Sequence, residues 1–170
     1  MKVIRSPHFL PMRGAAHEAA HAVAALVMGL EVTEVRIDRP GIGTSGWCVT
    51  PLDGRDPSTA DVITTLAAGL ADGGSGSTDF DEWPPPWPVC DGRGDQGRVH
   101  LLVRLLGITE PIYRDLLALT EDLVASPEFQ AGYRRLALAL KDNEVLDREE
   151  IRRIAAPYLP TDEKELSRAA

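Results

Sequence analysis

Residues 13–29 read RGAAHEAAHAVAALVMG, and this stretch carries two histidines separated by three residues. Alanine, valine and leucine fill most other positions, which favours an α-helix that is apolar on nearly every side. Helices of that kind are usually buried. We expect an extended segment over residues 1–11, a helix over residues 12–28, and a stop at Gly29.

His17 and His21 stand about one turn apart on this helix. Because an α-helix turns by about 100° and rises by about 1.5 Å per residue, both imidazoles can reach one metal ion from the same face. Glu18 stands beside that face, where its carboxylate can take a proton from a water molecule that the metal activates. The HExxH pattern is therefore typical of a zinc peptidase with Glu18 as general base.

The alternative is that these three residues are ordinary polar side chains on a buried helix. Burying several ionisable groups without partners is costly, and a metal ion would supply the partner. A catalytic zinc also needs a third protein ligand and an open position for water. The spacing alone does not choose it. The acidic candidates are Asp79, Asp81, Glu82, Asp91 and Asp95, and the remaining histidines, which we expect to be structural, are His8 and His100.

The rest of the chain predicts more helices and a small β-element. Residues 31–37 and 46–50 resemble strands that pair as a hairpin across a glycine-rich turn. Asp56 and Pro57 indicate the start of a helix. Its apolar stripe contains Val62, Ile63, Leu66 and Leu70. Further helices are expected over residues 95–107, 109–126, 127–141 and 147–156. The expected fold class is mainly α with a small β-hairpin or sheet.

The chain of 170 residues suits one domain, which we assign to residues 1–160. Within it, residues 73–94 are rich in glycine, proline and acidic residues, which predicts a long loop. Trp83 and Trp87 are expected to pack that loop onto the domain, and the alternative is a hydrophobic lid or a patch that binds a partner. Residues 161–170 are a polar tail.

The composition argues against several classes of function. A net charge of −8 disfavours a broad grip on nucleic-acid phosphates. No apolar run approaches the roughly 20 residues of a membrane helix, so we expect no membrane insertion. With no leader sequence apparent and only two cysteines, Cys48 and Cys90, we expect a reduced, cytoplasmic protein.

Five segments, in order, resemble the peptidase domain of FtsH-type membrane AAA proteases. The most specific is the motif helix RGAAHEAAHAVAALVMG, which looks like that family's HEAGHA helix. The others are EVTEVRI, ITTLAAGLAD, GDQGRVHLLVRLLG and LALKDNEVLDREEIRRI, and together the five span roughly residues 12–156. The resemblance implies a mostly helical zinc peptidase fold with a small β-element beside the cleft.

By this resemblance His17 and His21 are zinc ligands, Glu18 is the general base and Asp95 is the third ligand. The plain alternative for Asp95 is an N-cap role at the start of its helix. Ala20 stands where the family has glycine, and Gly94 stands where it often has serine or asparagine. No P-loop pattern for an ATPase is present, so the activity is expected to be ATP-independent.

The expected function is zinc-dependent hydrolysis of peptide bonds in flexible or unfolded chains. An extended substrate is expected to pair with the strand at residues 46–50. The alternative is a catalytically inactive metal-binding module, for regulation or protein interaction, derived from such a peptidase. A helical interaction domain without metal is a third possibility, and it predicts that His17, His21 and Asp95 do not converge.

Overall fold

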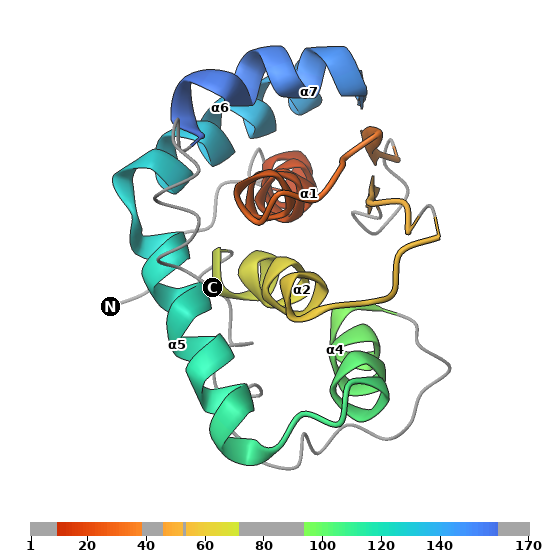
Figure 1. Ribbon diagram of the computed structural model, residues 1–170. Coiled ribbons are helices and arrows are strands. Elements are labelled where there is room, and N and C mark those ends of the chain that lie inside the picture. The colour runs from red at the N-terminus through yellow and green to blue at the C-terminus, as the bar shows by residue number, and fades with distance from the viewer. Residues whose placement is uncertain (1–9, 39–45, 53, 72–93, 160–170) are drawn as a thin grey trace.

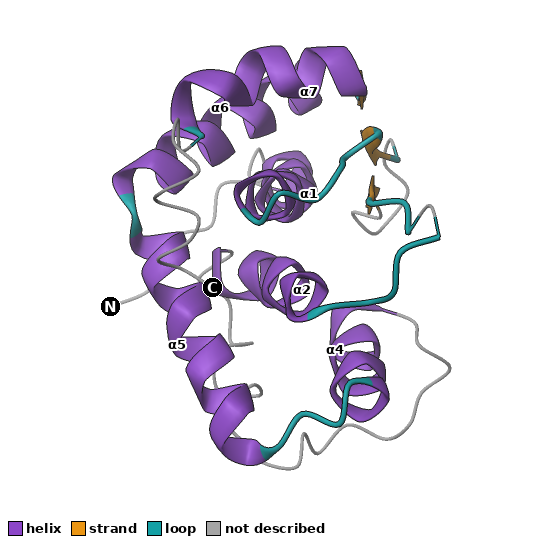
Figure 2. Ribbon diagram, in the orientation of Figure 1, coloured by secondary structure: helices purple, strands orange, loops and turns teal. Residues whose placement is uncertain are grey.

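The computed structural model describes residues 10–38, 46–52, 54–71 and 94–159. This part of the chain contains six α-helices and a small three-stranded antiparallel sheet at one side of them, so the expected mainly α class with a small sheet is confirmed (Figure 2). The helices are α1 (Leu10–Val27), α2 (Thr59–Ala71), α4 (Gly94–Leu105), α5 (Glu110–Ala125), α6 (Pro127–Asn143) and α7 (Arg148–Ala155). The strands are β1 (Glu34–Ile37), β2 (Gly46–Val49) and β3 (Val145–Asp147), and a short 3-10 turn covers Ala156–Tyr158.

Helix α1 lies at the centre of the molecule, between α6 on one side and α2 on the other (Figure 1). Its small side chains, among them Ala15, Ala19 and Ala22, are fully buried and allow both neighbours to approach closely. The expected burial of this helix is thus confirmed. The helix begins at Leu10, so the extended segment predicted up to residue 11 is wrong at its last two positions. Pro11 is tolerated there because the backbone N–H groups of the first helical turn have no partner within the helix, so the N–H that proline lacks costs no hydrogen bond.

The end of α1 follows the sequence prediction. Gly29 has a φ of 73°, a left-handed conformation that costs glycine little. The backbone N–H of Leu30 then donates a hydrogen bond to the carbonyl oxygen of Ala25 at 2.8 Å, which closes the helix.

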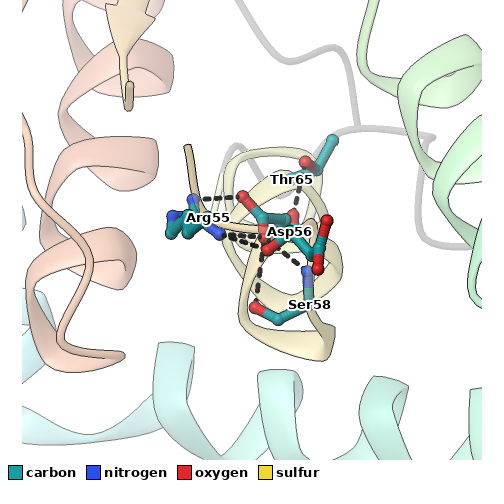
Figure 3. Close-up of polar contacts among 5 residues, drawn as sticks. Arg55, Asp56, Ser58 and Thr65 are labelled. Carbon is teal, nitrogen blue, oxygen red and sulfur yellow. Dashed lines mark hydrogen bonds and ion pairs between the residues drawn. The ribbon is translucent and has the colours of Figure 1, made fainter. Parts of the chain in front are cut away.

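Helix α2 begins at Thr59, two residues later than Pro57, so the predicted start at Asp56 and Pro57 is wrong. The reason is a polar cluster around Asp61, in the first turn. Two nitrogens of the Arg55 guanidinium donate to its carboxylate at 2.8 Å, and the Ser58 backbone N–H donates to it at 2.8 Å. These bonds hold residues 55–58 as a loop against the start of the helix (Figure 3).

Two apolar clusters form the core. The first joins α1 to the sheet, α6 and α7, and the second joins α2 to α4 and α5. Helix α2 contributes to both, because Ala67 and Ala68 face the first cluster while Val62 and Leu66 face the second. The predicted apolar stripe of α2 is therefore confirmed. The assignment of residues 1–160 to one domain stays a prediction.

The sheet has the strand order β2-β1-β3, and both pairings are antiparallel. The hairpin of β1 and β2 was predicted, although β1 begins at Glu34 rather than at residue 31. Strand β3 was not predicted. It pairs with β1 so that Val35 lies opposite Leu146, and both side chains are buried in the first cluster.

The predicted break between the last long helices occurs at Ser126, whose hydroxyl accepts a hydrogen bond from the Phe129 backbone N–H. The capping box expected before the last helix is confirmed, since Asp147 and Glu150 each accept a backbone hydrogen bond from the other residue. Most of the predicted loop over residues 73–94, with Trp83 and Trp87, and the tail over residues 161–170 lie outside the described residues.

Candidate metal centre

Helix α1 and the first turn of α4 bring three side chains to one point. His17 Nε2 lies 2.7 Å from Asp95 Oδ2, and His21 Nε2 lies 3.2 Å from Asp95 Oδ1. One ligand atom from each of the three residues lies within 4.8 Å of the other two. Asp95 is the second residue of α4, and its carboxylate faces the two histidines rather than serving as an N-cap. The structure thus joins the two histidines of the motif with the acid that the resemblance indicated.

The orientation of the His21 ring is fixed from helix α2. His21 Nδ1 lies 2.9 Å from the carbonyl oxygen of Thr64, and because a carbonyl oxygen only accepts, Nδ1 carries the proton. In a neutral ring the lone pair is then on Nε2, which faces Asp95. A backbone carbonyl that fixes the tautomer of a ligand histidine is a recurring feature of metal sites.

A positive charge is required where these groups meet. The Nε2 lone pair of a neutral His21 would point at a carboxylate oxygen, which is also an acceptor. Burial of Asp95 disfavours its charged form, but hydrogen bonds and positive charge from His17 and His21 outweigh burial and hold its pKa well below the usual range. The two acceptors that face each other at 3.2 Å are matched when a cation lies between them, either a proton on the imidazole or a metal ion.

The donor set fits zinc. His17 Nε2 and His21 Nε2 approach different oxygens of the Asp95 carboxylate, at 2.7 and 3.2 Å. One ligand atom from each of the three residues lies within 4.8 Å of the other two, a spacing at which the three could share one ion. Two imidazoles and one carboxylate also match the ligands of known catalytic zinc sites.

Glu18 is 7% exposed and lies against strand β2. A Cβ atom added at Gly46 would lie 2.7 Å from Glu18 Cγ and 2.6 Å from the carbonyl oxygen of Arg36. Only glycine therefore allows the strand to pass so close to the motif helix. Gly46 was expected only as the first residue of the strand over residues 46–50, because nothing in a single strand pattern indicates which distant helix will pack against it.

A pocket of about 120 Å³ adjoins the centre and is lined by Glu18, His21 and Asp95. Strand β2 and helix α2 supply other walls, including Cys48 and Thr64. The Thr64 hydroxyl is buried and has no hydrogen-bond partner within the described part of the chain. Since a buried hydroxyl normally finds a partner, this atom is suited to bonding a group that occupies the pocket.

The position of Cys48 in the pocket wall lowers the reactivity of its thiol. Burial raises the pKa of its thiol far above the usual range; the charge of Glu18 adds to that rise, and the charge of Arg98 opposes it. A thiol in this state is a poor nucleophile, because the thiolate is the reactive form. Cys48 therefore lines the pocket and is not suited to act as a nucleophile. Thr64, Cys48 and Arg98, at the same pocket, were all missed by the sequence analysis.

The other candidate ligands do not join the centre. His100 is half-buried on α4, and its Nδ1 has no hydrogen-bond partner among the described residues. It does not belong to the group that could hold a metal ion. His8 and the acids Asp79, Asp81, Glu82 and Asp91 lie outside the described residues.

No protein-family model matches the chain, and a search of curated proteins returns no match. None of the described helices is long and apolar enough to cross a membrane.

Proposed function

We propose that this chain is a zinc-dependent peptidase of the kind that the FtsH-type peptidase domains represent. The observation that carries the proposal is the meeting of His17, His21 and Asp95 with their ligand atoms within 4.8 Å, beside the buried carboxylate of Glu18. The family resemblance of the motif helix supports the same reading. The match between the donor set and zinc makes zinc the metal of choice.

Each residue has a distinct role in this proposal. His17, His21 and Asp95 hold the ion, and the Thr64 carbonyl holds the His21 ring in the required tautomer. The zinc, when bound, supplies Lewis acidity to a water molecule and to the scissile carbonyl. Glu18 accepts a proton from the attacking water as the new carbon–oxygen bond forms. It then delivers that proton to the amine as the carbon–nitrogen bond breaks.

The substrate is proposed to be an extended or unfolded chain. Strand β2 lies at the edge of the sheet and shares the pocket with Glu18 and His21. Its outer edge can therefore pair with a peptide backbone and lay the scissile bond beside the proposed ion. We propose that this activity is ATP-independent, with substrates that need no unfolding.

The test compares the full chain with its Glu18→Gln variant after loading with zinc. The substituted glutamine keeps the size of the side chain but cannot act as a base. We expect mass spectrometry to find about one zinc per chain in both proteins. Cleavage of an unfolded, fluorescently labelled protein should fall at least about 100-fold in the variant. Glu121→Gln, an exposed change on α5, is the matched control and should cleave as the original chain does.

The outcomes separate the alternatives. Equal cleavage by the original chain and by Glu18→Gln would remove Glu18 from the mechanism. A folded chain that binds iron in preference to zinc would contradict a zinc peptidase, because two histidines and one carboxylate also suit non-haem iron. Tight zinc binding without any cleavage would favour the inactive metal-binding module.

A further inference from the structure

Arg98 lies on α4, three residues after Asp95, and lines the same pocket. Residues three apart on a helix share a face, so Arg98 and Asp95 lie on the same side of α4, and both line the pocket. Arg98 is exposed, and it forms no hydrogen bond or ion pair with another residue of the described ranges.

Some arginines of the fold are paired: Arg55 bonds Asp61 at 2.8 Å, Arg114 bonds Glu110 at 2.8 Å, and Arg148 bonds Glu31 at 2.7 Å. Among the described arginines that form no ion pair, Arg98 is the one that lines the pocket. The pocket itself contains two acids, Glu18 and Asp95, yet neither is paired with Arg98. The guanidinium at this pocket is thus available for a charged group that arrives from outside.

The charge of Arg98 acts inside the pocket, since it is one of the three influences on the Cys48 thiol. The guanidinium therefore places a positive charge at the wall of the pocket, where it favours an anionic ligand, even though the chain as a whole carries a net charge of −8.

We propose that Arg98 is a specificity-determining residue that binds a carboxylate of the peptide substrate at the pocket. The substrate class is then peptides with an acidic side chain, or the terminal carboxylate, close to the scissile bond. This inference rests on the proposed peptidase function. Arginine suits the task because its planar guanidinium can hold both carboxylate oxygens at once.

The proposal is tested by binding, independently of cleavage. Three labelled peptides of equal length are titrated against the zinc-loaded full chain carrying Glu18→Gln, and fluorescence anisotropy is recorded. One peptide has a central glutamate and an amidated end, one is neutral with a free C-terminal carboxylate, and one is neutral and amidated. We expect one or both carboxylate peptides to bind about tenfold more tightly than the neutral, amidated one.

Adding Arg98→Gln should abolish that preference. Arg98→Glu should reverse it, so that a fourth peptide, with a central lysine and an amidated end, binds more tightly than the peptides with a carboxylate. Arg98→Lys should restore part of it, because lysine keeps the charge and loses the two-point contact. Arg104→Gln, an exposed change on the same helix that lies away from the pocket lining, should keep the preference. It controls for the overall loss of one positive charge.

Each result bears on one proposal or the other. Which of the two carboxylate peptides depends on Arg98 identifies the source of the carboxylate. A preference that survives Arg98→Gln, or the absence of any preference or binding, overturns the role of Arg98. If the original chain cleaves peptides but shows no carboxylate preference, only the specificity fails. If the preference is found and depends on Arg98, but the original chain cleaves nothing, the recognition stands and the peptidase function fails.

Discussion

Glu18 on the motif helix and Gly46 on strand β2 are in such close contact that a methyl group on residue 46 would lie 2.7 Å from Glu18 Cγ. The contact packs the side chain of the proposed base, Glu18, against strand β2. It also places the edge strand against the pocket, because Gly46 and Glu18 both line it.

Gly46→Ala should reduce both stability and activity. The added methyl group would also lie 2.6 Å from the Arg36 carbonyl oxygen, so the strand or the glutamate must move. Overpacking of this kind costs about 1–3 kcal/mol. Urea unfolding measures that loss, and peptide cleavage should fall while zinc affinity stays within a few-fold, because the ligands come from α1 and α4.

A double variant tests the cause. Gly46→Ala combined with Glu18→Ala removes the side-chain clash and keeps the backbone one, so part of the stability should return. Strictly additive losses in the cycle would mean that the two residues do not press on each other.

Asp95→Asn should weaken zinc binding, because the amide has nearly the same shape but no negative charge. Partners outside the ligand shell already contribute about 10–100-fold to metal affinity, so loss of a direct ligand should cost more than about 100-fold. Competition with a coloured chelator measures the affinity. Asp115→Asn, an exposed change on α5, is the control. Unchanged affinity in Asp95→Asn would exclude Asp95 as a ligand.

Asp61 should contribute stability that depends on pH. Burial disfavours its charge, but hydrogen bonds from Arg55 and Ser58 prevail and lower its pKa from 3.8 to about 2. A lowered pKa in the folded state gives stability that is complete above the unfolded value near 3.8 and is lost as pH falls towards 2. The shift corresponds to about 2 kcal/mol.

Chemical unfolding of the original chain and of Asp61→Asn, measured from pH 7 down to about pH 2, tests this account. The difference in unfolding free energy should be constant at neutral pH and should narrow below about pH 4. A difference that grows as the pH falls would contradict the ion pair with Arg55 as its cause.

Cys48 should resist alkylation in the folded protein. Burial raises the pKa of its thiol, so little thiolate is present at pH 8 to attack iodoacetamide. In a Cys90→Ser background, modification measured by mass spectrometry should be at least about 100-fold slower in buffer than in denaturant. Similar rates in the two conditions would show that the thiol is open to solvent.

The helical framework was predictable because local signals decide it. Gly29 ended α1 as expected, and Asp147 with Glu150 opened α7. The start of α2 was misplaced because Asp61 gathers Arg55 and Ser58, a cluster that forms only after the loop folds back. Short strands such as β3 carry too few residues for a periodic pattern, so their pairing depends on the tertiary fold.

The residues of the candidate centre also differ in how far the sequence alone could predict them. His17, Glu18 and His21 were visible because one helical turn sets their spacing. Asp95 was one of five acidic candidates on sequence grounds, and only the family resemblance selected it. Thr64 and Arg98 carry no local signal, since a threonine carbonyl and a surface arginine gain a role only from what folds against them.

Strand β3 is added to the sheet from the far end of the chain, and it covers one side of β1. A protein shortened after Asn143 would lose β3 and α7 and would leave β1 and β2 as a two-stranded hairpin with one edge of β1 uncovered. The uncovered backbone of β1 would then be free to recruit strands from other molecules. The shortened chain should therefore form oligomers or aggregates when it is expressed. By this account, the segment that carries β3 protects the folded protein from aggregation.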